Sequence, residues 1–286
     1  MSKPPTRTPS ADLIRVTGGK IRADVTDFIT EISLDYGVGQ VNELTIAVAD
    51  PTGLLDNTPL AEPGAEVTVT GTAGAWEVGA IDAEYGAGIV WSYRCRSKIA
   101  RQLRKRYKVG SEREVSPTEW VTRRVKDVGG RVVAQKSAKR VAIGQAGNDE
   151  AQSSLDIIEE LAGELEWEWL ERDGVLYFGD PYWAYTGGAK TATWPVTWKR
   201  DPASDALSLS VSLSDDDRES AGTLDVTLPY LAGQRIRPWD RLRVSDVGRY
   251  AGEWLVESVT YPLDNVGPVN VQSRRPRKPR KKGGST

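Results

Sequence analysis

Three acidic residues at alternate positions are the strongest candidates for catalytic groups in this sequence. Glu164, Glu166 and Glu168 lie in the stretch ELEWEWLE, and on a strand they would share one face while leucine and tryptophan occupied the other. Glycoside hydrolysis needs two carboxyl groups about 5 to 10 Å apart in a cleft, one of them with a raised pKa. Alternate strand residues reach such separations without a catalytic role. An exposed acidic face over a buried aromatic face explains the pattern, and we favour it over a glycosidase.

Two other polar stretches resemble ligand-binding motifs but lack the required spacing. In GGAKT, from Gly187 to Thr191, Ala189 separates the glycine from Lys190, whereas a phosphate loop has them adjacent. The segment SDDDRES puts carboxylates side by side, and calcium loops need alternating ligands with a turn glycine. Its acidic residues are Asp215, Asp216, Asp217 and Glu219. We predict a turn, a solvated acidic loop, and no metal or other cofactor.

The absence of histidine narrows the catalytic options further. It excludes Ser-His-Asp and Cys-His centres, the common zinc sites and the ordinary near-neutral proton switch. Cys95 is the single cysteine, so no intrachain disulfide is possible and folding in a reducing compartment is expected. We also expect no signal peptide and no membrane insertion, because no apolar stretch approaches the ~18 residues of a spanning helix. Our prediction is a protein without enzymatic activity.

The sequence ends in a strongly basic arm. Its seven basic residues are Arg274, Arg275, Arg277, Lys278, Arg280, Lys281 and Lys282. Without them, 31 basic residues face 40 acidic ones, so residues 1–273 carry a net charge of −9. The arm could be a solvated tail, a strap on an acidic protein surface, or a salt-sensitive nucleic-acid contact. We favour the strap.

A second basic stretch, RQLRKRYK at residues 101–108, contains one tyrosine. Nucleic-acid binding would require a broad basic surface, and the acidic body argues against one. We expect a solvated helix face or a stripe of salt bridges between subunits.

Alternation with period two dominates both ends of the chain, and helical spacing dominates its middle. Strands are expected within residues 29–37, 41–50, 65–71, 76–86 and 88–97, and again within 206–215, 222–231, 240–246, 252–264 and 267–273. Helices are expected within 97–107, 116–130 and 153–163. Residues 164–180 then return to strand, with a hairpin turn at Asp173-Gly174.

The two β blocks repeat each other, at offsets of 175 to 180 residues. The matches are Phe28, Ile32 and Leu34 with Leu207, Val211 and Leu213; Leu44, Ile46 and Val48 with Leu224, Val226 and Leu228; Pro63, Val67 and Val69 with Pro238, Leu242 and Val244; Trp76, Val78 and Ile81 with Trp254, Val256 and Val259; and Val90 with Val269. Any two β meanders share alternation, but the preserved order and the shared Trp-x-Val motif favour duplication. Trp76, Val78 and Ile81 are expected to occupy the same core positions as Trp254, Val256 and Val259.

The final block resembles the closing module of phage tail-hub, or baseplate-hub, proteins, the group that includes phage late control protein D. That module has a Pro-Gly-Asp turn before a strand, a Gly-aromatic-x-Val strand that reaches a histidine, and a last strand ending in Arg-Pro. Pro238-Trp239-Asp240 stands for the turn, and Gly252 to Val256 for the strand. Tyr261 lies where histidine is frequent, and Arg275-Pro276 follows the last strand.

The resemblance implies an α+β, mainly β fold with two similar, tail-tube-like β-barrels. We expect a first barrel at residues 1–97, a helical insertion at 98–150, a small α+β subdomain at 151–200, a second barrel at 201–273 and the basic arm at 274–286.

It further implies a homotrimer whose six barrels form a pseudo-sixfold ring with a channel for DNA in transit. The partners would be the tail tube or distal tail protein, the central spike or tip, and possibly the tape-measure protein. Such a protein is made in the bacterial cytoplasm and ends in the virion tail. The alternatives are a carbohydrate-active tail-tip protein, which binds or weakly hydrolyses glycan, and a nucleic-acid-binding protein that acts through the arm.

Overall fold

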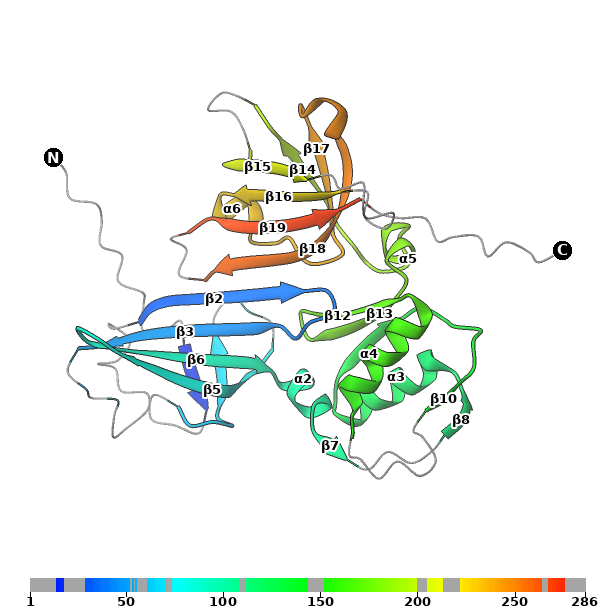
Figure 1. The fold of residues 1–286 in the computed structure, drawn as a ribbon, viewed down its shortest axis with the longest axis horizontal. Helices are drawn as coiled ribbons and strands as arrows, with labels where there is room; N and C mark the ends of the chain where they lie inside the picture. The colour runs from blue at the N-terminus through cyan, green and yellow to red at the C-terminus, as the bar shows by residue number, and fades with distance from the viewer. Residues whose placement is uncertain are drawn as a thin grey trace.

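The computed structural model of the chain describes residues 14–17, 29–51, 53, 55, 61–69, 72, 74–107, 112–143, 152–199, 205–212, 222–263 and 267–275. The fold is mainly β, with two blocks of strands and a helix-containing unit beside them (Figure 1). The predicted α+β, mainly β class is confirmed. In the described parts of the chain no helix is long and apolar enough to cross a membrane.

The first block contains six antiparallel strands in the order β1-β4-β5-β6-β3-β2. Their bounds are β1 (Ile14–Thr17), β2 (Ile29–Gly37), β3 (Glu43–Asp50), β4 (Glu66–Val69), β5 (Trp76–Tyr85) and β6 (Ile89–Ser97). Along β3, buried residues alternate strictly with half-buried residues, as the sequence pattern predicts.

The second block has the order β15-β16-β19-β18-β17-β14. Its strands are β14 (Thr193–Thr197), β15 (Ser208–Ser212), β16 (Thr223–Leu228), β17 (Arg241–Ser245), β18 (Gly252–Pro262) and β19 (Val269–Arg274). When the strands of the two blocks are matched, the order of the five predicted pairs is the same. The sixth differs, because β14 runs parallel to β17 whereas β1 runs antiparallel to β4.

The repeat extends to irregular features of the sheet. A register shift interrupts β5 between Val78 and Ala80, and β18 has one at the same place, between Val256 and Ser258. The turn before β4 also recurs before β17. Gly64 N–H donates to the Val78 carbonyl at 2.8 Å, and Trp239 N–H donates to the Val256 carbonyl at 2.8 Å. Two blocks that share a bulge and a turn are repeats of one design.

The strand pairing corrects two of our matches. Val269 pairs with Leu228 as Trp91 pairs with Val48, so Val269 corresponds to Trp91 and not to Val90. Val90 points to the opposite face and is exposed. Similarly, Ile32 and Leu34 of β2 correspond to Leu209 and Val211 of β15, two residues earlier than we matched them. A shift of two residues along a strand keeps the same face, so the inward face of β15 was predicted correctly. Phe28 and Leu213 lie outside the described residues.

Neither block closes into a barrel within the described residues. The strand path is open from β1 to β15, because the outer edge of β2 pairs with β18 of the other block. The two blocks therefore form one continuous sheet (Figure 1). A single hydrophobic core contains buried residues from both of them. Of the paired tryptophan-strand residues, Ile81 is half-buried and five are buried: Trp76, Val78, Trp254, Val256 and Val259.

The unit between the blocks has its own core. Its elements are α2 (Lys98–Leu103), β7 (Arg106–Tyr107), β8 (Glu112–Val115), α3 (Pro117–Asp127), β9 (Arg131–Ala134), β10 (Val141–Ile143), β11 (Gln152–Ser153), α4 (Ser154–Leu165), β12 (Glu168–Arg172), β13 (Val175–Gly179) and α5 (Pro181–Tyr185). Helix α3 begins with Pro117 at its first position, and α4 begins with a capping box between Ser153 and Asp156. In the second block, α6 (Tyr230–Gly233) and η1 (Gly248–Tyr250) complete the described helices.

Residues on both sides of position 150 share the core of this middle unit, which includes Trp120 of α3 and Leu155 of α4. Strand β14, which precedes position 200, pairs with β17 of the second block. The boundaries at 150 and 200 stay predictions, because a shared core or a strand pair does not by itself define a domain.

Candidate functional site

The three candidate catalytic glutamates do not lie on one strand. Helix α4 continues to Leu165, and Glu166 ends it in the left-handed conformation, with φ 56°. The backbone N–H of Trp167 then closes the last turn on the Ala162 carbonyl at 2.8 Å, so the strand begins only at Glu168. Our prediction of strand from residue 164 is therefore wrong, because the helix-ending turn lies inside the alternating stretch.

Each of these carboxylates has a different environment. Glu164 is exposed and lies 3.7 Å from Lys139. Glu168 forms an ion pair with Arg274 and accepts a hydrogen bond from Trp239 Nε1 at 3.1 Å. Glu168 is therefore engaged in structural contacts within the chain.

The other two polar stretches contribute no recognisable site. Gly187, at φ 97°, forms a turn after α5, and the side chain of Ala189 is buried in a small core with Trp239. The acidic residues from 215 to 219 lie outside the described residues. In the described part of the chain, no three acidic or cysteine side chains are grouped so as to hold a metal.

The first two residues of the basic arm bind their own chain. Arg274 forms ion pairs with Glu168 and, at 3.1 Å, with Glu257. Arg275 stacks on Trp254 with 4.3 Å between the guanidinium carbon and the ring centre, and it donates to the Tyr250 carbonyl at 3.1 Å. The other five basic residues lie beyond residue 275, outside the described residues.

The most elaborate arrangement of polar groups lies where the two blocks and the middle unit meet. Residues Ser33 to Gly37 of β2 pair antiparallel with Ser258 to Pro262 of β18. We call this contact the block joint. Across it, Tyr36 and Tyr261 meet edge to face with ring centres 5.7 Å apart.

Arg237 fills the joint and connects all three units. Its guanidinium lies 5.2 Å from the ring centres of both Tyr36 and Tyr261, and Nη1 donates to the Tyr261 hydroxyl at 2.8 Å. Its Nε lies 3.1 Å from Asp173, at the tip of the β12–β13 hairpin. Burial raises the pKa of Tyr36 and of Tyr261, so both stay neutral and Arg237 keeps its charge. Tyr261 therefore does not titrate near neutral pH.

The turn at Trp239-Asp240 attaches the second block to the middle unit. Trp239 adopts φ 69°, which is unfavourable for a tryptophan, but its ring is buried against Tyr177 and Trp183. Asp240 is fully buried and forms an ion pair with Arg172 at 2.9 Å. It also accepts hydrogen bonds from Trp194 Nε1 at 2.8 Å and from the Ala192 N–H at 2.9 Å. Packing of the Trp239 ring and the bonds of Asp240 therefore hold this turn in place.

The first block is attached to the middle unit by a buried carboxyl that sequence reasoning missed. Glu171 lies at the end of the stretch ELEWEWLE, and it accepts a hydrogen bond from the Ser97 hydroxyl. Its backbone carbonyl accepts from Asn42 Nδ2 at 2.9 Å. Burial raises the pKa of Glu171 from 4.5 to about 7, and the Ser97 hydrogen bond opposes that shift. No local pattern distinguishes Glu171 from its exposed neighbours, because its burial results from contacts with β6.

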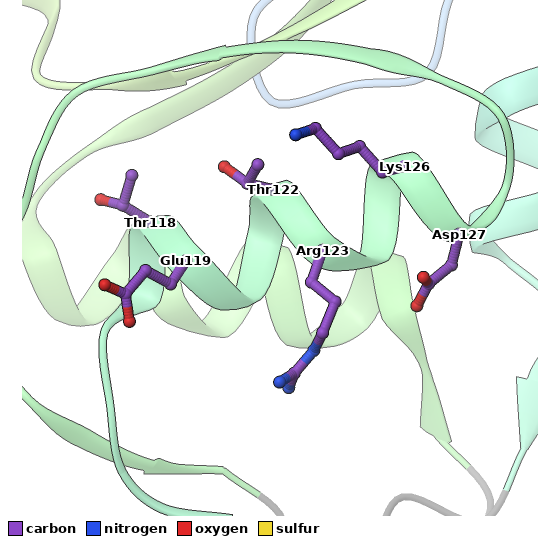
Figure 2. A pocket seen from close by; sticks show the side chains of 6 residues that line it. All are labelled: Thr118, Glu119, Thr122, Arg123, Lys126 and Asp127. Atoms are coloured by element: carbon purple, nitrogen blue, oxygen red, sulfur yellow. The ribbon is translucent and has the colours of Figure 1, made fainter.

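Away from the joint, the described part of the chain lines surface cavities, including one on the middle unit and one on the second block. One, of about 420 Å³, lies along α3 and is lined by Thr118, Glu119, Thr122, Arg123, Lys126 and Asp127 (Figure 2). Its charges have both signs, and Arg123 is already bound to Glu112 at 2.5 Å. The other, of about 520 Å³, lies at one end of the second block, lined by Trp198, Leu209, Asp246, Val247 and Gly248.

The sequence matches no protein-family model and no curated protein. Solved structures match over almost the whole chain. The 43 kDa tail protein of prophage MuSo2 from Shewanella oneidensis is 13% identical, with a TM-score of 0.64, over 92% of this chain and 95% of that one. A tail protein from Neisseria meningitidis MC58 is 11% identical, with a TM-score of 0.64, over the same shares of the two chains.

The c3393 protein of E. coli, described as a component of the type VI secretion system with structural similarity to T4 bacteriophage tail proteins, is 11% identical. Its TM-score is 0.64 over 93% of this chain and 77% of that one. At this level of identity the likeness concerns the fold. The chain has the fold of these phage tail and secretion-system proteins.

Proposed function

We propose that the protein is a structural tail hub of a phage-like particle, as its closing block suggests. In this proposal three copies form a ring of six similar β blocks, which joins the tail tube or distal tail protein to a central spike or tip. The observation that carries the proposal is the repeated strand order of two blocks that already share one sheet within a single chain. The fold it shares with tail proteins over 92% of its length supports the same conclusion.

The repeat suits a change of symmetry along a tail. Three chains that each contribute two similar blocks offer nearly equivalent surfaces six times on one face, and three times wherever the blocks differ. A sixfold tube can then contact one face and a threefold spike the other. The tape-measure protein is a further candidate partner inside the ring.

The charge of the body agrees with a passage for DNA. Residues 1–273 have a net charge of −9, and an acidic wall would repel the phosphate backbone and not retain it. We propose no catalytic role, since the paired or exposed glutamates of residues 164–168 are engaged in structural contacts or solvated. The protein would be found in the tail tip or baseplate of the virion.

We also propose that the basic arm is an assembly strap. Arg274 and Arg275 anchor it on the second block, and the five basic residues that follow would bind carboxylates of a neighbouring hub subunit or tail protein. Deleting residues 276–286 should impair tail assembly. Normal tails from the deletion would refute the strap, and loss of DNA contact with intact tails would favour nucleic acid as its partner.

The ring is tested by the mass of the purified protein and by averaged images of single particles. We expect a mass of three chains and a ring with six similar lobes. A monomer at every concentration, or a ring of six chains, would contradict the proposal.

A further inference from the structure

The block joint has an incomplete counterpart elsewhere in the chain. β18 pairs with β17 along its first half and with β2 along its second half. Its repeat, β5, pairs with β4 only at Trp76 and Glu77. Among the described residues, the outer edge of β5 from Ala80 to Glu84 has no strand against it, and neither has the outer edge of β15, the repeat of β2. Each chain thus contains one complete joint and the two separate halves of another.

Side-chain burial distinguishes the complete joint from its separate halves. On β18, Tyr261 is buried, and its repeat on β5, Ala83, is exposed. Just beyond β18, Leu263 is 8% exposed and its N–H donates to the Ile32 carbonyl at 2.7 Å. The repeat of Leu263 is Tyr85, which is 68% exposed. The far end of the inward row of β5, at Ala83 and Tyr85, is therefore apolar or small but exposed.

The β2 side shows the same difference. Ile32 and Leu34 are buried in the complete joint, whereas their repeats Leu209 and Val211 are only half-buried. Leu209 also lines the cavity of about 520 Å³ at the end of the second block. Strand β18 lies against β2 and covers Ile32 in the first block. In the described part of a single chain, no strand lies against the outer edge of β15 to cover Leu209 in the same way.

We infer that β5 of one copy pairs antiparallel with β15 of the next copy, in the register of the block joint. This inference rests on the proposed ring and names its interface. Carried over through the two repeats, the register places Asp82 opposite Ser212, Ala83 opposite Val211 and Glu84 opposite Ser210. Tyr85 would then approach Leu209 and the cavity that it lines.

The polar groups at the edges support this register. In the block joint, the Thr260 hydroxyl donates to the Asp35 carboxylate at 2.6 Å. In the joint between copies, Asp82 of β5 takes the place of Thr260, and Ser212 of β15 takes the place of Asp35. The carboxylate and the hydroxyl are therefore exchanged between the two strands. The Ser212 hydroxyl can donate to the Asp82 carboxylate, so the pair stays complementary. Two carboxylates at these positions would have repelled each other.

The arrangement is also compatible with a closed ring. β5 and β15 are different edges, so the contact is head-to-tail, and a head-to-tail contact gives a ring or a filament. If the joint between copies repeats the geometry of the joint within a copy, successive blocks turn by a constant angle. First and second blocks then alternate around the ring, and the joint within a chain and the joint between chains have the same strand pairing.

Cysteine cross-linking of the full chain tests the register. The double variant Asp82→Cys, Ser212→Cys should form disulfides between copies, giving species of two and three chains on a non-reducing gel. Mixing the single variants Asp82→Cys and Ser212→Cys should give two-chain species alone. The variant Asp82→Cys, Ser208→Cys, four residues out of register, is the matched control and should lose these bands. Cys95 is buried and is present in every variant.

A variant at the complete joint separates the possible outcomes. Asp35→Cys, Thr260→Cys should form a disulfide within one chain whatever the assembly. If the protein has the mass of three chains but the 82–212 pair gives no cross-link, the pairing is wrong and the ring stands. If the mass is that of one chain and only the 35–260 disulfide forms, both the pairing and the proposed function are wrong.

Discussion

The two β blocks share a strand order, but different side-chain contacts attach each of them to the middle unit. Before β4, the turn has Gly64 at φ 95° followed by Ala65, whereas before β17 it has Trp239 at φ 69° followed by Asp240. The first block meets the middle unit through the Glu171–Ser97 hydrogen bond, and the second through the Asp240–Arg172 ion pair. A repeated backbone thus tolerates divergent side chains wherever each block has its own neighbour. Both blocks retain the strand order, the bulge and the buried tryptophan.

The largest expected effect concerns that tryptophan. Trp254→Ala and Trp76→Ala should each lower the free energy of unfolding by about 3 to 5 kcal/mol, since each removes a buried ring from the shared core. Each indole N–H also donates to a partner four residues earlier, Thr72 for Trp76 and Tyr250 for Trp254. Trp254→Ala should cost more, by about 0.5 to 2 kcal/mol, because Arg275 stacks on that ring.

Denaturant unfolding of the two variants measures the difference. Comparing Trp254→Ala, Arg275→Ala and the variant that carries both changes isolates the stacking. An unchanged transition for either single variant would mean that the two rings are not equivalent parts of the core.

The second prediction uses pH to test the Glu171–Ser97 attachment of the first block separately from the Asp240–Arg172 attachment of the second. The pKa of Glu171 is raised from 4.5 to about 7 in the folded chain, so folding favours its protonated form. This contribution is fully present below pH 4.5, declines as the pH rises, and is lost above about pH 7. It is on the order of 3 kcal/mol, since one pKa unit corresponds to about 1.4 kcal/mol.

Glu171→Gln keeps a neutral acceptor for the Ser97 hydroxyl and should remove this part of the pH dependence. The measurement is denaturant unfolding at several values between pH 4.5 and pH 8, with Glu164→Gln as an exposed control. A wild-type slope that Glu171→Gln leaves unchanged would assign the pH dependence to other groups.

The third effect tests why Trp239 is kept at a left-handed position. Trp239→Gly relieves about 1 to 2 kcal/mol of backbone strain but loses a buried ring, for a net loss of about 2 kcal/mol. The matched change in the first block, Gly64→Ala, adds strain at φ 95° without losing a ring and should cost about 1 kcal/mol. A more stable Trp239→Gly variant would show that the packing against Tyr177 and Trp183 contributes little.

The smallest effect compares the joint within a copy with the joint between copies. Asp35→Ala removes the hydrogen bond from Thr260 and should lower the stability of a single chain by about 0.5 to 1.5 kcal/mol. Asp82→Ala should instead weaken association by a similar amount per joint, with little change in the stability of one chain.

Mass measurements over a dilution series report association. Because Asp82 also lies 2.9 Å from Arg94, Arg94→Ala serves as the control that removes this ion pair alone. Equal association of Asp82→Ala and the wild type would argue against the register.

Several features of the site were accessible from the sequence, and others were not. The turn at Pro238 and the offset of 178 residues between β5 and β18 were both evident from local patterns. The helix end at Glu166 was missed because the alternation of glutamate with leucine and tryptophan extends across it. The use of Glu168 to hold Arg274 and Trp239 joins residues 106 and 71 positions apart, and no local pattern records such contacts.

Alternating apolar residues, turn prolines and glycines, and the repeated Trp-x-Val motif by themselves determined the strands and their duplication, because these signals act between neighbours along the chain. The tertiary structure alone decided that β2 pairs with β18, that Glu171 is buried and that Arg237 lies between Tyr36 and Tyr261. These contacts join residues up to 229 positions apart. They depend on which edge and which face each folded unit leaves for the others, and that is a property of the packed units together.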